Sequence, residues 1–256
     1  MKQAQTPLAG RRIVVTRARA QASQLVDRLG ALGADVLQAP VIRIEPLPDL
    51  TLMHRALERL SSYDWVVFTS QNTVEIACTE PVAFAQTKVA AIGPATAQAL
   101  EQLGVRVALV PPRHVAEGLV DALAAEELHG SDVLILAAEK TRPVLEDGLR
   151  AQGAVVDVVP VYRTVPEGGD GAALGRELAT GKIDAVTFTS SSTVEHFVSL
   201  VGRDVAGCGR FVAAVIGPVT AATARELDVA RGGLIEASPS TADGLVAALV
   251  RDLGVK

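Results

Sequence analysis

The stretch FTSQNTVE, residues Phe68–Glu75, returns later in the chain as FTSSSTVE, residues Phe188–Glu195. The second copy lies 120 residues after the first in a chain of 256. Two further pairs of motifs recur in the same order: AIGPAT (Ala91–Thr96) with VIGPVT (Val215–Thr220), and EGLVDAL (Glu117–Leu123) with DGLVAAL (Asp243–Leu249). This period is too long for a solenoid, so we interpret the chain as one fold that occurs twice.

Short apolar runs alternate with helical segments through both copies of the repeat. RIVVT at Arg12–Thr16 and DWVVFT at Asp64–Thr69 are typical of fully buried strands, and Val105–Val110 is predicted to be another. Ala20–Leu32 places its leucines at helical spacing, and Gly33 ends that helix. The alternation predicts ten strands, five per repeat, and an α/β fold with two parallel doubly wound sheets.

Two proline-bearing segments, Ala39–Asp49 and Val161–Gly171, occupy equivalent positions in the repeat and are interpreted as linkers. The second segment ends in the glycine-rich run Gly168–Gly171, which we expect to be a hinge loop rather than a phosphate cradle. The repeat by itself favours a contiguous division of the chain near residue 128.

The composition limits the classes of function. The chain is 49% hydrophobic and 3% aromatic, so its core is aliphatic, as buried parallel strands require. A net charge of −5 and the lack of a basic run argue against nucleic-acid binding. Two cysteines without paired spacing and four scattered histidines predict neither a disulfide framework nor a metal site. The first residues lack the apolar core of a signal peptide, and no apolar run approaches ~18 residues, so we expect a cytoplasmic protein that does not enter a membrane.

The strand ends are the predicted functional positions, because ligands of doubly wound folds bind at the carboxyl ends of the strands. Each predicted strand leads into a helix through a turn rich in Thr, Ser, Gly or Pro, and a helix N-terminus attracts anions through its N–H groups and its dipole. The candidate anion-binding residues in these turns are Thr69, Ser70, Gly93, Pro94, Ala95, Thr96, Ser190, Ser191, Ser192, Gly217, Pro218, Val219 and Thr220. For the serines the alternative is a purely structural N-cap.

Three arginines and one tyrosine are weaker candidates. Arg17 and Arg19 follow the first strand, and Arg142 follows a later one, where a guanidinium can pair with a carboxylate; the alternative is a solvated surface arginine. Tyr162 is one of two tyrosines, and its counterpart in the repeat is Ile42. A functional phenol and a tyrosine that only packs both fit this position.

Several common catalytic motifs are absent from the sequence. It contains no G-x-G-x-x-G after a strand and no G-x-x-x-x-G-K-[ST], so dinucleotide and nucleoside-triphosphate binding lack their usual support. It contains no G-x-S-x-G, so a hydrolase triad is also unsupported.

The ordered set of motifs resembles the uroporphyrinogen-III synthase family from about Ile13 to Leu249. The motifs are IVVTR (Ile13–Arg17), VVFTS (Val66–Ser70), AIGPAT (Ala91–Thr96), EGL (Glu117–Leu119), VYRT (Val161–Thr164), FTSSS (Phe188–Ser192) and VIGPVT (Val215–Thr220). The resemblance implies an enzyme of tetrapyrrole biosynthesis that closes linear hydroxymethylbilane to uroporphyrinogen III. The reaction inverts ring D, releases water and needs no metal or organic cofactor.

The resemblance also implies two flavodoxin-like domains joined by a two-stranded linker. One domain is expected to comprise residues 1–37 plus 168–256 and the other 47–161, with linkers at 38–46 and 162–167. The octacarboxylate substrate is expected to be held by backbone N–H groups of the turns, helped by Arg17 and Arg142. Tyr162 matches the family's linker tyrosine, which implies a proton donor or a group that positions the leaving hydroxyl. We further expect a monomer that receives its substrate from hydroxymethylbilane synthase.

Two other classes fit a pair of doubly wound lobes. A sensor or solute-binding protein closes on a small anion without catalysis, but no export signal or DNA-binding helix pair is evident. A two-lobed glycosyltransferase requires a nucleotide-sugar site, which nothing in the turns specifies.

Overall fold

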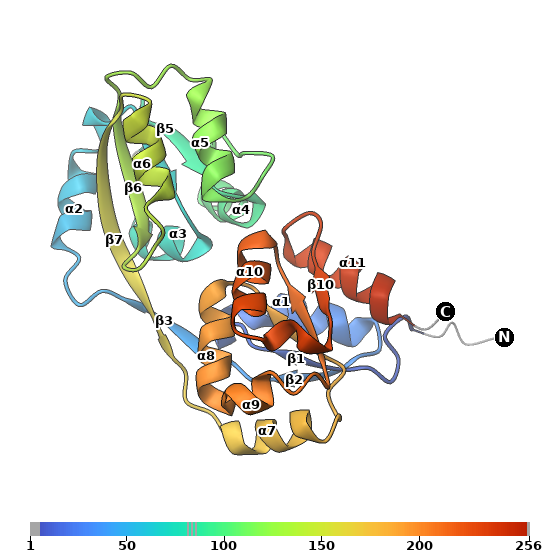
Figure 1. Ribbon diagram of the computed structural model, residues 1–256. Coiled ribbons are helices and arrows are strands. Elements are labelled where there is room, and N and C mark those ends of the chain that lie inside the picture. Colours follow the sequence, from blue (N-terminus) through green and yellow to red (C-terminus); the bar gives the residue numbers. More distant parts are fainter. Residues whose placement is uncertain (1–5, 81, 83, 85, 255–256) are drawn as a thin grey trace. The chain divides into compact units, whose positions relative to one another are not determined.

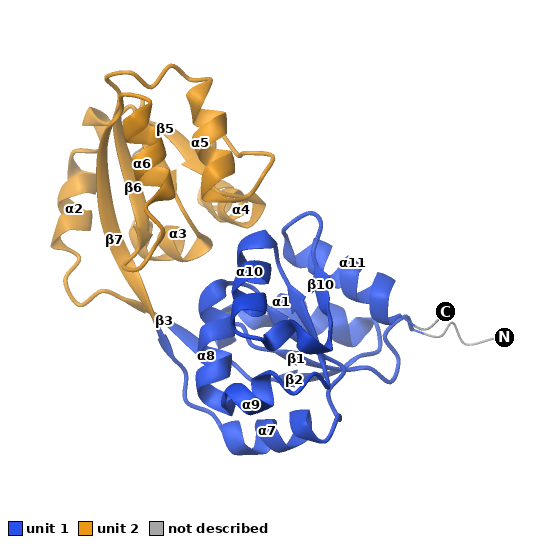
Figure 2. Ribbon diagram, viewed as in Figure 1, with its two compact units in different colours: residues 1–43, 165–256 blue, residues 44–164 orange. Residues whose placement is uncertain are grey.

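The computed structural model describes residues 6–80, 82, 84 and 86–254. The chain forms two compact units: unit 1 comprises residues 1–43 and 165–256, and unit 2 comprises residues 44–164 (Figure 2). The polypeptide therefore leaves unit 1 once and returns to it once. The narrower domain and linker ranges implied by the family resemblance stay a prediction.

Unit 1 is built on a parallel sheet in the order β10-β9-β8-β1-β2, of which β10, β1 and β2 are labelled in Figure 1. Its strands are β1 (Arg12–Val15), β2 (Asp35–Gln38), β8 (Ala185–Phe188), β9 (Val212–Val215) and β10 (Leu234–Glu236). Its helices are α1 (Arg19–Ala31), α7 (Gly171–Ala179), α8 (Ser191–Val201), α9 (Arg203–Ala206), α10 (Pro218–Glu226) and α11 (Ala242–Leu253), with a 3-10 turn at Val229–Gly232. Counted within the unit, the strand order is 2-1-3-4-5, which is the flavodoxin-like arrangement.

Unit 2 has a sheet in the order β3-β7-β6-β4-β5, in which β7, β6, β4 and β5 are parallel. Its strands are β3 (Ile42–Pro46), β4 (Trp65–Phe68), β5 (Lys88–Ala91), β6 (Asp132–Ala138) and β7 (Val155–Pro166). Its helices are α2 (Thr51–Glu58), α3 (Gln71–Ala77), α4 (Pro94–Gln102), α5 (Ala116–Ala124) and α6 (Val144–Ala151), with a 3-10 turn at Leu60–Ser62. The predicted α/β class with two doubly wound parallel sheets is confirmed.

Both faces of each sheet are covered, as the nearly continuous apolar strands require. In β4 the side chains of Val66 and Phe68 join a core with α2, α3 and α4, whereas Trp65 and Val67 join a core with α5 and α6 on the opposite face. In unit 1, Ile13 and Val15 pack against α1 and α11. Burying an aliphatic side chain of this size contributes about 1.5–3 kcal/mol, so the two-sided burial is the main force holding each unit together.

Each unit combines strands from both copies of the repeat. β1 of the first copy pairs with β8 of the second, and β6 of the second copy pairs with β4 of the first. The contiguous division near residue 128 favoured by the repeat alone is therefore wrong. The central strands of each sheet exchange hydrogen bonds across the repeat, so neither repeat folds as a unit of its own.

The two linker segments contain regular structure. Leu47 N–H donates to Val161 O at 3.1 Å, and Glu167 N–H donates to Val41 O at 2.9 Å, so β3 runs antiparallel to the last part of β7. The predicted strand Val105–Val110 is reduced to a single parallel bridge between Ala90 and Leu109. Within the described residues, no helix is long and apolar enough to cross a bilayer.

Candidate functional site

The predicted site residues of each unit gather at the carboxyl edge of its sheet. In unit 1 the chain continues from β1 to one side and from β8 to the other, so these neighbouring strands form the switch point of the sheet. The turn after β1 holds Arg17, and the turn after β8 holds Ser190. In unit 2 the corresponding neighbours are β6, followed by Arg142, and β4, followed by Ser70. Each unit therefore places one arginine-bearing turn beside one serine-bearing turn.

The serine turns are capping boxes. Ser70 Oγ accepts from Thr73 N–H at 3.2 Å at the start of α3, and Ser190 Oγ accepts from Thr193 N–H at 3.3 Å at the start of α8. Each threonine hydroxyl lies near the backbone N–H of its serine in return, at 3.4 and 3.2 Å. The structural interpretation of the two serines as N-caps is thus confirmed.

The serine turn of unit 1 carries an extended hydroxyl cluster. Ser190 Oγ lies 2.9 Å from Ser192 Oγ, and Ser191 Oγ lies 2.7 Å from Thr223 Oγ1 of α10. Thr223 also donates to Val219 O at 3.2 Å. Sequence reasoning missed Thr223, although it lies one helical turn beyond Val219 on the same helix.

The two Gly-Pro turns begin α4 and α10 with proline at the first helical position. The first helical hydrogen bond in α4 is donated by Ala97 to Gly93 O, at 3.0 Å. The N–H groups of Ala95 and Thr96 precede this bond and have no acceptor within the helix. In α10 the same geometry applies to Val219 and Thr220, because Ala221 N–H donates to Gly217 O at 2.9 Å.

The glycines of these turns lie close to a side chain of a neighbouring loop. Gly93 and Gly217 are extended, a conformation open to any residue. A Cβ at Gly93 would lie 3.2 Å from His114 Cβ, and one at Gly217 would lie 2.7 Å from Ser240 Oγ. In each unit, the loop that carries this side chain therefore limits the space for a larger residue at the glycine position.

Thr69 has a structural partner. Its Oγ1 donates to Leu136 O at 2.9 Å and so ties the end of β4 to β6. In unit 1 the buried Thr16 has the equivalent task, because its Oγ1 donates to Thr187 O at 2.6 Å between β1 and β8. Thr187 Oγ1 also donates to Val14 O, at 3.1 Å, so threonine hydroxyls tie together the neighbouring strands at both switch points.

The two predicted arginines are engaged by neighbours. Arg17 Nε donates to Gln21 Oε1 at 3.3 Å. Arg142 contacts both carboxylate oxygens of Glu117, at 2.6 and 3.2 Å. This hydrogen-bonded ion pair lowers the pKa of Glu117 and raises that of Arg142. A substrate carboxylate would have to share or replace Glu117.

Tyr162 is turned towards a core face of unit 2 by a β-bulge. Ala137 of β6 pairs with Pro160, but the next residue, Ala138, pairs with Tyr162, so one residue of β7 is skipped. The bulge places Tyr162 with Val159 in the core beneath α2, α3 and α4, and its side chain is 8% exposed. Among the described residues its hydroxyl has no hydrogen-bond partner. The bulge was not evident from the sequence.

The described part of the chain holds no group of three or more His, Cys, Asp or Glu residues that could bind a metal ion.

Comparison with known proteins decides the family. The family model described as uroporphyrinogen-III synthase HemD matches residues 23–247. A putative uroporphyrinogen-III synthase of Methanothermobacter thermautotrophicus is 33% identical over 94% of this chain and 98% of its own length. The chain belongs to the uroporphyrinogen-III synthase family.

Other family members agree in sequence and in fold. The uroporphyrinogen-III synthase of Synechococcus elongatus is 31% identical over 96% of this chain and 97% of its own length. A porphyrin biosynthesis protein HemD of Ruminiclostridium josui is 29% identical, and the chain spans about half of it, 48%. The crystal structures of a mutant uroporphyrinogen III synthase from Thermus thermophilus and of the Helicobacter pylori enzyme have TM-scores of 0.61 and 0.60 at 20% and 16% identity. Each alignment covers 94% of this chain, and 98% and 99% of the respective structure. These structures show the same two-domain α/β fold.

Proposed function

We propose that this chain cyclises linear hydroxymethylbilane to uroporphyrinogen III, with inversion of ring D and release of water, in tetrapyrrole biosynthesis. Membership of the uroporphyrinogen-III synthase family over most of the chain carries this proposal. The geometry supports it, because both sheets present helix N-termini at their carboxyl edges, where an anionic ligand is favoured.

The N-termini of α4, α8 and α10 are proposed to bind the acetate and propionate groups of the substrate. The Gly-Pro helices each offer two N–H groups before their first helical bond, from Ala95 and Thr96 in α4 and from Val219 and Thr220 in α10. In α8 the cap occupies Thr193 N–H, so Ser191 and Ser192 supply the remaining donors. Because the net charge of −5 repels an anion at long range, binding relies on these local fields.

The other predicted residues have supporting roles in this proposal. Arg17 and Arg142 add guanidinium contacts, the latter in competition with Glu117. Thr69 and Ser70 hold the turn after β4 in place, because each hydroxyl forms a hydrogen bond with the backbone: Thr69 with Leu136 O and Ser70 with Thr73 N–H.

Tyr162 is proposed to donate a proton to the departing hydroxyl group, or to position that group. A phenol O–H can donate to the oxygen that leaves as water. The lack of a protein partner for its hydroxyl within the described residues supports this role. The main role of the enzyme in this proposal is to hold the linear bilane in a folded conformation. This conformation favours the attack on ring D that leads to its inversion.

Three further expectations belong to this proposal. The protein is proposed to act in the cytoplasm, as a monomer, and to receive hydroxymethylbilane from hydroxymethylbilane synthase. The small-molecule nature of the substrate follows from the family.

The test incubates freshly prepared hydroxymethylbilane with the purified protein, oxidises the products and separates the type I and type III isomers by chromatography. The proposal predicts mostly type III, well above a control without enzyme. Type I alone, at the rate of that control, would refute the proposal and favour an anion-binding protein without catalysis.

A further inference from the structure

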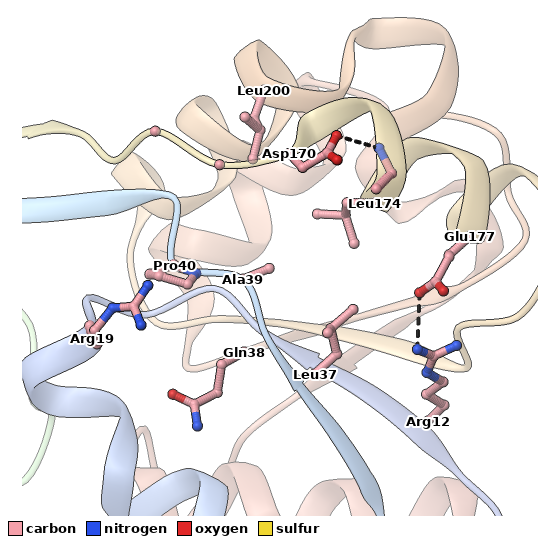
Figure 3. Close-up of a pocket in the computed structure, with 13 residues that line it drawn as sticks. Arg12, Arg19, Leu37, Gln38, Ala39, Pro40, Asp170, Leu174, Glu177 and Leu200 are labelled. Carbon is pink, nitrogen blue, oxygen red and sulfur yellow. Dashed lines mark hydrogen bonds and ion pairs between the residues drawn. The ribbon is translucent and has the colours of Figure 1, made fainter.

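Unit 1 contains a cavity of about 340 Å³ that none of the proposed substrate-binding residues lines (Figure 3). The cavity lies between the end of β2, the start of α1, the start of α7 and the end of α8. Leu37, Leu174 and Leu200 give it an apolar wall, to which Ala39 and Pro40 also contribute. Its volume is at the lower end of the range for small-molecule sites, ~300–1,000 Å³, and is too small for a tetrapyrrole with eight carboxylates.

Of the two arginines that line the cavity, one has no carboxylate partner among the described residues. Arg12 is neutralised by Asp35 and Glu177, each 3.1 Å from its guanidinium. Asp170 caps α7 by accepting Ala173 N–H at 2.8 Å, so the positive end of that helix offsets its charge. Among the described residues, no carboxylate pairs with Arg19, which lies on the side of the cavity near Pro40 (Figure 3).

We infer that this cavity is an effector site for a small organic carboxylate with a branched aliphatic body. The carboxylate pairs with the Arg19 guanidinium, and the aliphatic body covers the leucine wall. An unpaired guanidinium beside an apolar surface selects an anion over a cation of the same shape. The apolar wall selects a branched hydrocarbon body over a small inorganic anion.

The cavity also adjoins both connections between the units. Gln38–Pro40 lie where the chain leaves β2 towards unit 2, and Gly168–Asp170 lie where it has returned to unit 1. A Cβ added at Gly168 or Gly169 would meet no neighbouring atom within 4 Å, so the structure packs nothing against these two glycines on that side. A ligand that contacts both segments restrains them, and we expect it to slow any turnover that needs the units to move. This consequence rests on the proposed function.

The binding test uses 4-methylpentanoate as the probe and isothermal titration calorimetry as the measurement. Wild-type protein is expected to bind this carboxylate and not 4-methylpentylamine, which has the same body and the opposite charge. Arg19→Gln is expected to weaken binding at least about tenfold. Arg176→Gln is the matched control, because it removes an arginine from α7 that does not line the cavity. Ala173→Leu, which fills the cavity, is expected to abolish binding.

Each outcome decides part of the inference. No binding of 4-methylpentanoate up to about 10 mM, or equal affinity for the amine, would overturn the effector site. Unchanged affinity in Arg19→Gln with folded protein would overturn the assigned charge contact. Binding without any change in the rate of type III formation would overturn the restraint on the linker segments. Absence of type III formation in ligand-free wild type would refute the proposed function and leave the binding result unaffected.

Discussion

Arg142 and Glu117 form a two-point ion pair at the carboxyl edge of unit 2, with Nη1 2.6 Å from Oε1 and Nη2 3.2 Å from Oε2. Arg142 follows β6, and Glu117 lies in the first turn of α5. Both side chains are nearly half exposed, at 46% and 42%, so solvent screens the pair and it contributes little to folding stability. The pair sets how available Arg142 is for an anionic ligand.

The first prediction concerns that availability. Arg142→Gln should raise the KM for hydroxymethylbilane about tenfold, because a charge-assisted contact is worth about 1.5–3 kcal/mol. Glu117→Gln should lower KM, because it releases the guanidinium. Asp121→Asn removes a carboxylate from the same helix and its ion pair with Arg113, and serves as the control. Steady-state kinetics measure all three, and an unchanged KM in both Arg142→Gln and Glu117→Gln would exclude Arg142 from binding.

The pH dependence of this pair follows from the lowered pKa of Glu117. A carboxyl with a depressed folded-state pKa stabilises the protein above its unfolded pKa and loses that effect as pH falls through the folded value. Glu117 therefore stays ionised and paired at neutral and mildly acidic pH. Kinetics between about pH 6 and 8 should show no change in KM from this group.

The second prediction separates the capping role of Ser190 from a role in anion binding. Ser190→Ala should destabilise the protein by about 1 kcal/mol, because the cap on Thr193 N–H is lost. Ser190→Asn and Ser190→Asp both retain a capping oxygen and should be nearly as stable as wild type. If the start of α8 binds a substrate carboxylate, only Ser190→Asp should raise KM strongly, about tenfold or more, by charge repulsion. Equal KM values for the Asn and Asp variants would remove α8 from the site.

The third prediction compares two helical glycines. A Cβ at Gly244 of α11 would lie 2.0 Å from the backbone oxygen of Pro239, so Gly244→Ala should destabilise the protein by about 3 kcal/mol. A Cβ at Gly175 of α7 would only meet Val205, at 3.8 Å. Gly175→Ala should therefore stabilise the protein by about 0.5–1 kcal/mol, because alanine is the better helix former. Urea unfolding measures both, and equal effects would contradict the packing explanation.

The fourth prediction concerns Tyr162. Tyr162→Phe keeps the ring in the core of unit 2 and removes only the hydroxyl, which has no partner among the described residues. Stability should change by less than about 0.5 kcal/mol, whereas the rate of type III formation should fall about 10²-fold or more. A full rate with normal folding would exclude Tyr162 as proton donor or leaving-group positioner.

The fifth prediction concerns the other tyrosine. Burial raises the pKa of Tyr63 from 10.0 to about 12, aided by its hydrogen bond to Asp157 at 2.6 Å. In the Tyr162→Phe variant, the absorbance of the remaining tyrosine should titrate near pH 12. Because the folded-state pKa is raised, the contribution of Tyr63 to stability is full below pH 10 and declines as pH rises towards 12. Asp157→Asn should move the titration back towards 10, and a midpoint of 10 in the parent variant would contradict the buried hydrogen bond.

Much of the fold follows from the sequence because its signals are local. Apolar β-branched runs such as Ile13–Val15 favour buried strands. Helices α3, α8 and α11 begin at a Ser or Thr cap, and α4 and α10 begin at a Gly-Pro turn. The same local signals placed Ser70 and Ser190 as caps, and the structure confirms both. Local patterns did not reveal the bulge beneath Tyr162 or the pairing of Arg142, since each depends on a partner on another element.

The amino-acid sequence by itself determined the alternation of strands and helices, the duplication and the order of motifs that marks the family. The repeat alone favoured the wrong grouping of strands, and the tertiary structure decided which strands share a sheet. The two copies of the repeat carry nearly the same strands and turns, so β1 beside β8 and β1 beside β4 are locally equivalent choices. The hydrogen-bond ladders and the cores of Ile13 and Val66 on their separate sheets resolve that choice, because only long-range packing distinguishes one copy from the other.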